Sequence, residues 1–168
     1  MLLKAVAFAV VSIAANICAI EEQIACTHGF LCRFVGTYEA TGISFKKPAR
    51  LAMRWAADLG GAFVRVDYRI DTSTSRTRER HDSVAYLKTG GVNHFVGTWL
   101  DSQGAIQPLD ASAAGGTLTA FWGVRGKGAY GRTTYRLLDD RRVEVVDSVV
   151  DERGVWNEQS HNTLIKTE

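Results

Sequence analysis

The sequence predicts an all-β protein, a single up-and-down antiparallel barrel of about ten strands. From residue 33 to 166, turn signals such as Lys47-Pro48 and Gly115-Gly116 recur about every eight to eleven residues, and no stretch between them has a convincing helical period. Strands joined by such short loops pair with their sequence neighbours. Closure into a barrel then removes the exposed edges that about ten open strands would leave.

Composition agrees with one globular β domain. The 168 residues are 46% apolar and 23% charged, which is enough to bury a real core. Sixteen glycines against two prolines suit many short strands and tight turns. The formal net charge of +2 gives no basic field, so we expect no nucleic-acid partner.

The first nineteen residues differ from the rest and predict a signal peptide at 1–19. Lys4 precedes an unbroken run of apolar or small residues from Ala5 to Ala15, and Ile17-Cys18-Ala19 then ends in a small residue before acidic Glu21-Glu22. We therefore expect an exported, periplasmic or secreted protein with no stable membrane span after cleavage. An uncleaved anchor, a buried N-terminal helix and a lipidated Cys18 remain alternatives. The expected division is a signal peptide (1–19), an N-terminal segment (20–33) and a barrel domain (34–168).

Cleavage after Ala19 leaves Cys26 and Cys32, an even pair in an oxidising compartment, and we expect a disulfide between them. Closing this short loop stabilises the fold by about 2 kcal/mol in the chain-entropy model. A metal or redox pair assisted by His28 is the alternative, although the spacing differs from the common two-residue cysteine motifs.

Alternation defines the strands and their buried faces. Leu51, Met53 and Trp55 share one face of a strand whose other face carries Arg50 and Arg54. The sixth strand contains Pro108, which cannot donate a ladder hydrogen bond. The expected strands are 34–45, 49–59, 62–71, 82–89, 93–101, 105–113, 117–124, 128–138, 142–151 and 154–166.

The last three strands predict an inward row of charged residues. If the hairpins turn on residues 139–140 and 152–153, then Arg132 lies opposite Asp147, and Asp147 lies opposite Glu158. Their face is the more apolar one, so the row is expected to point inward. Buried charges are costly unless paired.

Functionally, this row predicts the polar floor of a ligand pocket. An internal salt bridge that fixes strand register and a solvated row at the rim are the alternatives, and a one-residue bulge turns Glu158 outward. The aromatic walls are expected from Trp55, Tyr68, Trp99, Trp122 and Trp156.

Several runs resemble a known superfamily. Gly36-Thr37-Tyr38 followed by Gly42 resembles the Gly-x-Trp opening of calycin-type barrels, the lipocalin and fatty-acid-binding superfamily. The runs 97–104, 116–118 and 151–156 resemble a family of exported bacterial calycin-like proteins of unknown function. The resemblance implies a calycin-like barrel and covers most of the chain after the leader.

The leading hypothesis is an exported barrel that binds a small apolar or amphipathic molecule without transforming it, and that needs no cofactor or metal. One alternative is an enzyme with Asp147 or Glu158 as general base beside Arg132, although the chain has no Gly-x-Ser-x-Gly, phosphate-loop or His-Glu-x-x-His motif. Another is a nitrobindin-like haem barrel, for which His161 is the candidate axial ligand. A third is a structural module with a filled barrel.

Overall fold

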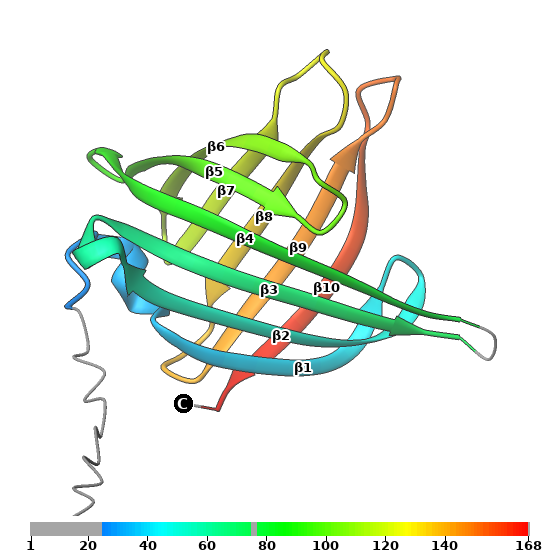
Figure 1. Ribbon diagram of the computed structural model, residues 1–168, viewed down its shortest axis with the longest axis horizontal. Helices are drawn as coiled ribbons and strands as arrows, with labels where there is room; N and C mark the ends of the chain where they lie inside the picture. Colours follow the sequence, from blue (N-terminus) through cyan, green and yellow to red (C-terminus); the bar gives the residue numbers. More distant parts are fainter. Residues whose placement is uncertain (1–24, 75–76, 168) are drawn as a thin grey trace, which may run out of the picture.

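The computed structural model describes residues 25–74 and 77–167, which form one closed antiparallel barrel (Figure 1). Each strand pairs with its neighbours in the sequence, and the first pairs with the last to close the ring. The predicted all-β, up-and-down barrel is therefore confirmed. The strands are β1 (Gly36–Ser44), β2 (Lys47–Asp58), β3 (Phe63–Ser73), β4 (Arg78–Gly91), β5 (His94–Asp101), β6 (Ile106–Ala114), β7 (Thr117–Gly123), β8 (Tyr130–Leu137), β9 (Arg142–Val150) and β10 (Trp156–Lys166).

Inward and outward positions alternate on β2 as the sequence predicts. Leu51, Met53 and Trp55 face the interior and are at most 2% exposed, whereas Arg50 and Arg54 are exposed. The same alternation continues on β3. Because the inward positions of all the strands bring apolar side chains together, they form one continuous core.

The β3–β4 hairpin is longer than the sequence predicts, because β4 begins at Arg78 and not at residue 82. Asp71 and Arg80 are cross-strand partners there, as are Thr72 and Glu79. The charged side chains of Asp71, Glu79 and Arg80 stay in water while the backbone groups pair, whereas Thr72 is buried. In Figure 1 this hairpin extends beyond the others.

Pro108 fits within β6 because that strand has only one neighbour at this point. Pro108 pairs with Thr98 of β5, whereas the ladder with β7 begins at Leu109. A residue without an N–H is tolerated where one side of the strand needs no donor.

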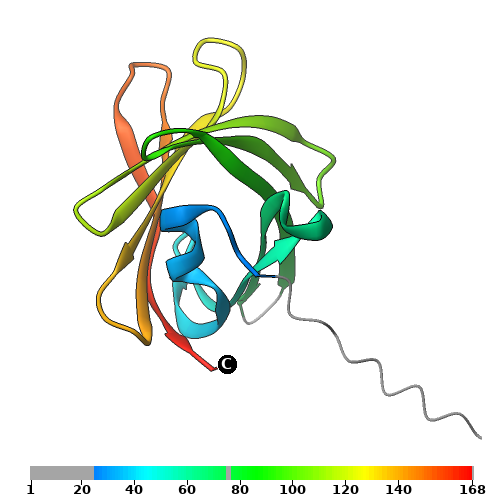
Figure 2. The same cartoon turned by 90° about the vertical axis from the view of Figure 1, so that its left-hand side faces the viewer.

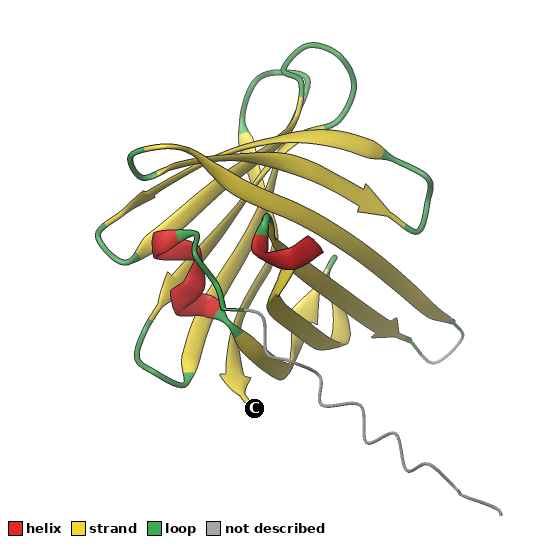
Figure 3. Cartoon of the chain, turned by 60° about the vertical axis from the view of Figure 1, so that its left-hand side comes forward, coloured by secondary structure: helices red, strands yellow, loops and turns green. Residues whose placement is uncertain are grey.

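The two ends of the barrel differ. The closed end carries two short 3₁₀ helices, η1 (Gly29–Phe34) before β1 and η2 (Leu59–Gly61) between β2 and β3. Figure 2 shows η1 lying across this end, and Figure 3 shows both helices in red. The open end is formed by the β1–β2, β3–β4, β5–β6, β7–β8 and β9–β10 connections.

Aromatic packing fills the closed end. Leu31 and Phe34 of η1 are 0% exposed. The Phe34 ring stacks on Trp55 with centroids 4.9 Å apart and meets Tyr135 edge-on. The Tyr38 hydroxyl donates to the Phe34 carbonyl over 2.9 Å. The helix η1 thus plugs the closed end of the barrel and is part of the core.

A disulfide and a histidine hold η1 in place. Cys26 and Cys32 form a disulfide with their Cα atoms 5.5 Å apart, which confirms that prediction. His28 Nε2 lies 2.9 Å from the Gly61 carbonyl, and His28 Nδ1 lies 3.3 Å from the Thr89 hydroxyl. The disulfide loop therefore joins η1 to the β2–β3 connection and to the last residues of β4.

The predicted signal peptide at 1–19, with Cys18, lies outside the described residues. Within the described ranges, no helix is both long and apolar enough to cross a membrane.

Candidate functional site

A cavity of about 400 Å³ occupies the interior of the barrel on the side of the open end. It exists because inward positions that are filled by large apolar residues near η1 carry smaller or polar residues here. The described interior is therefore not packed solid. The lining residues are Phe45, Tyr68, Ile70, His81, Asp82, Ser83, Trp99, Asp101, Ser102, Gln103, Ala105, Gln107, Trp122, Ala129, Thr133, Asp147, Val149 and Gln159.

The floor of the cavity is polar. Toward the closed end, the lining stops at Tyr68 on β3, Thr133 on β8 and Asp147 on β9. The next inward residues on these three strands belong to the buried core: Val66, Tyr135 and Val145.

Asp147 belongs to a polar row that crosses four strands inside the barrel. Thr133, Asp147, Ser160 and Ser44 are successive cross-strand partners on β8, β9, β10 and β1. The Thr133 hydroxyl donates to Asp147 Oδ1 over 2.7 Å, and the two serine hydroxyls are 2.9 Å apart. Asn162 Nδ2 donates to Ser160 Oγ over 2.8 Å. The serine hydroxyls of the row thus have their hydrogen-bond partners within the protein.

The Asp147 carboxylate faces the cavity deep inside the barrel. Burial raises the pKa of Asp147 to about 6, although the Thr133 hydroxyl and the nearby Tyr68 hydroxyl lower it. No Lys, Arg or His side chain of the described residues forms an ion pair with it. Asp147 is therefore a largely enclosed acid with a raised pKa and with no cationic partner among the described residues.

Tyr68 completes the floor from the opposite side. Its side chain is 4% exposed, and its hydroxyl approaches Asp147 and Ser160 without meeting either in hydrogen-bond geometry. Burial raises the pKa of Tyr68 well above its usual value, so the phenol stays protonated. An unsatisfied buried hydroxyl costs free energy, which a ligand with a polar group could recover.

Two tryptophans form walls above this floor. Trp99 on β5 and Trp122 on β7 both line the cavity. A Cβ on Gly131 would clash with the Trp122 ring, so the ring lies directly on the Gly131 backbone. Gly131 pairs with Val149, one inward position nearer the open end than Asp147. The apolar walls therefore stand between the mouth and the polar floor.

Four of the eight predicted site residues line the cavity, namely Asp147, Tyr68, Trp99 and Trp122. Trp55 is inward too, but it belongs to the core against Phe34. The remaining three are on the outer surface: Arg132, Glu158 and Trp156.

The predicted Arg132–Asp147–Glu158 row is wrong because both hairpins differ from two-residue turns. Leu137 pairs with Val143, so the β8–β9 register places Arg132 opposite Ser148. Because Asp147 points inward, the next residue, Ser148, points outward. Cross-strand partners share one face of the sheet, so Arg132 points outward as well. Its guanidinium lies 4.7 Å from the centroid of the Trp156 ring.

The β9–β10 pair contains the bulge that the sequence left open as an alternative. The register shifts between Glu158 and Ser160, so Ser160 lies opposite Asp147 while Glu158 faces solvent. His161 is also outside, with Nε2 3.3 Å from Glu144 Oε1. The arginine–carboxylate pair of the enzyme hypothesis and an inward His161 for haem are therefore not formed.

Several polar residues of the cavity lining and its polar row were not predicted from the sequence. Thr133 and Gln107 are inward strand positions, and their even spacing from inward Tyr135 and Leu109 could have identified them. Ser160 could not be assigned in this way, because the bulge changes the parity of β10.

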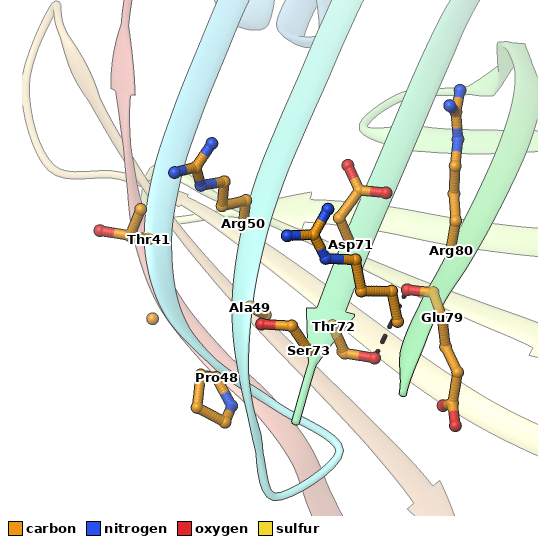
Figure 4. Close-up of a pocket in the computed structure, with 11 residues that line it drawn as sticks. Thr41, Pro48, Ala49, Arg50, Asp71, Thr72, Ser73, Glu79 and Arg80 are labelled. Atoms are coloured by element: carbon orange, nitrogen blue, oxygen red, sulfur yellow. Dashed lines mark hydrogen bonds between the residues drawn. The ribbon is translucent and has the colours of Figure 1, made fainter. Parts of the chain in front are cut away.

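A larger hollow of about 830 Å³ lies over β1–β4 near the β1–β2 and β3–β4 hairpins (Figure 4). Thr41, Arg50, Asp71 and Arg80 line it as one cross-strand row, and all four are exposed. It lacks the apolar walls that small-molecule sites usually have. The cavity inside the barrel is the better candidate site.

No protein-family model matches this chain, and no curated protein sequence matches it at a significant level. Among the described residues, no group of three or more His, Cys, Asp or Glu side chains is arranged to hold a metal ion.

Proposed function

We propose that this protein binds a small amphipathic molecule inside its barrel without transforming it. The observation that carries this proposal is the cavity, whose tryptophan walls lead to a floor with an unpaired carboxylate and an unsatisfied hydroxyl. Apolar walls with a few convergent polar groups are the usual composition of a ligand site.

The size of the cavity limits the ligand. At roughly 30 Å³ per water molecule, 400 Å³ corresponds to about thirteen waters, so a ligand of a similar number of non-hydrogen atoms fits. A single-ring compound with a short chain meets this limit. Long unbranched lipids exceed it unless part of the chain remains at the open end.

We also propose that the protein is exported and related to the calycin-like barrels that its motifs resemble. The disulfide supports this proposal, because such bonds persist mainly in oxidising compartments. N-terminal sequencing of protein from the native host should give a start near Ile20. Recovery of an intact Met1 on a cytoplasmic product is the contrary result.

A matched pair of variants tests ligand binding. Val149→Phe adds a ring to the cavity lining, whereas Val150→Phe adds the same ring to the outer face, where Val150 pairs with Trp156. The measured quantity is the Kd of N-phenyl-1-naphthylamine, a small fluorescent apolar probe, with circular dichroism to check folding.

We expect Val149→Phe to weaken probe binding at least tenfold and Val150→Phe to leave it within twofold. Equal effects of the two changes, or no saturable binding by the wild type, would overturn the proposal. Native mass spectrometry of protein from its own host gives the second readout, since a retained molecule should be lost from Val149→Phe alone.

A further inference from the structure

We propose that the ligand is an amphipathic amine, with its apolar body between the cavity walls and its ammonium group at Asp147 and Tyr68. This inference rests on the proposed function and names the ligand class for the same cavity. Two independent features support it, namely the charges of the lining and the hydrogen-bonding groups of the floor.

The lining is acidic. Asp82, Asp101 and Asp147 contribute carboxylates, while the lining contains no Lys or Arg and one His, His81. Carboxylates in a cavity with low-dielectric walls create a negative potential, which favours a cation and disfavours an anion.

Two of these carboxylates already have partners near the mouth. Asp82 accepts from Arg69 over 2.9 Å and from Arg80 over 2.7 Å. Asp101 Oδ1 accepts from the backbone N–H groups of Gln103 and Ala105. Asp147, by contrast, accepts one hydrogen bond among the described residues, from the Thr133 hydroxyl to Oδ1. Among these three carboxylates, the deepest is thus the one that has neither an arginine partner nor a second hydrogen-bond donor among the described residues.

The floor offers acceptors where an ammonium group needs them. A primary ammonium has three N–H donors and no acceptor. Asp147 Oδ2 has no hydrogen-bond partner among the described residues, and the Tyr68 oxygen is equally unpartnered. Serine oxygens elsewhere in the polar row are already paired with each other and with Asn162.

The walls suit the same ligand. Trp99 and Trp122 can cover an apolar body, and tryptophan faces attract a cation within about 6 Å of the ring centroid. A ligand with a carboxylate is repelled by the negative charge of Asp147. An alcohol can form hydrogen bonds there, but it gains no charge attraction.

A matched series of three probes tests this inference. The compounds are 4-phenylbutylamine, 4-phenyl-1-butanol and 4-phenylbutanoate, which share one apolar body and differ in the polar end. Isothermal titration at pH 8 should give Kd values at least tenfold lower for the amine than for the alcohol, with the carboxylate weakest.

Variants then assign the preference to the floor. Asp147→Asn should weaken the amine at least tenfold and change the alcohol by less than threefold. Tyr68→Phe should weaken the amine by a smaller factor. Asp110→Asn is the control, because Asp110 lies on the outer face of β6 with a largely exposed side chain, and it should leave all three affinities unchanged.

The pH dependence gives a second readout. Amine affinity should fall about tenfold between pH 7 and pH 5, because Asp147 has a pKa of about 6 and its ionised form is the one that holds the cation. The other titratable groups that face this space are Tyr68 on β3, Tyr135 on β8, His81 and Asp82 on β4, and Asp101 on β5. The fall should persist in His81→Asn and disappear in Asp147→Asn.

The outcomes separate the two proposals. Equal affinity for the three probes, with binding still lost in Val149→Phe, overturns the amine inference and leaves the ligand cavity standing. Binding that Val149→Phe does not affect, or no binding of any probe, overturns the proposed function and the inference with it. A carboxylate preference contradicts the inference alone.

Discussion

The two ends of this barrel use the same inward strand positions for opposite purposes. At the closed end, inward aromatic residues pack against η1, and Phe34 is completely buried between Trp55 and Tyr135. At the open end, the same alternation leads to the polar row and the cavity. The difference indicates that the closed end carries most of the stability, whereas the open end gives up packing for an accessible interior.

The largest expected effect tests this division directly. Phe34→Ala removes a fully buried ring from the closed end and should lower the free energy of unfolding by about 3–5 kcal/mol. Trp99→Ala removes a half-buried ring from the cavity wall and should cost about 1–2 kcal/mol. Urea denaturation at pH 7.5 measures both. Equal losses at the two sites contradict the division.

The second prediction concerns the contribution of Asp147 to the pH dependence of the free energy of unfolding. Burial raises the pKa of Asp147 from 3.8 to about 6, so the folded protein favours the protonated acid. This contribution to stability is fully present below about pH 4 and is lost as pH rises through about 6. At about 1.4 kcal/mol per pKa unit, the ionised carboxylate costs up to about 3 kcal/mol at pH 7.5.

Asp147→Asn should therefore raise the free energy of unfolding at pH 7.5 and give little change at pH 4. Urea denaturation at the two pH values checks this, with Asp110→Asn as the exposed control. A gain of the same size at both pH values means that ionisation of Asp147 is not its cause.

The third prediction concerns the disulfide that ties η1 to the segment before it. Replacing Cys26 and Cys32 together by serine should lower the free energy of unfolding by about 2 kcal/mol, because the short loop regains freedom in the unfolded chain. Thermal unfolding with and without a reducing agent measures this effect. Reduction should destabilise the wild type and leave the double variant unchanged.

The smallest expected effect concerns the outer face. Arg132 stacks over Trp156 at the surface, so Arg132→Leu should change stability by no more than about 1 kcal/mol. Ligand binding should remain as in the wild type. A loss of 3–5 kcal/mol is what a buried ion pair would give, and it would contradict the outward placement.

Local patterns were sufficient to predict the fold and most strand bounds. Apolar and charged residues alternate most regularly along β2 and β3, and turn signals separate the remaining strands. The interior positions of Tyr68, Trp99 and Trp122 follow from that alternation. The helix η1 was not predicted, since six residues carry too little periodic signal.

The composition of the polar row depended on features that local sequence does not encode. Asp147 was identified, but its neighbours depend on the lengths of the β8–β9 and β9–β10 connections and on the bulge in β10. Each shifts the pairing by one residue, and each shift exchanges an inward for an outward set. Thr133 and Ser160 therefore replaced Arg132 and Glu158 as the partners of Asp147.

The closing ladder between β1 and β10 also constrains how the protein folds. Tyr38 pairs with Lys166, and Ser44 pairs with Ser160, so this ladder joins residues more than a hundred positions apart. Such distant pairing is slow to form, because the chain loses loop entropy before it gains contacts. Until β10 docks, β1 and β9 both remain open edges, and the half-made sheet is exposed to pairing with other chains. Loss of β10 alone should therefore convert the closed barrel into an open sheet that aggregates.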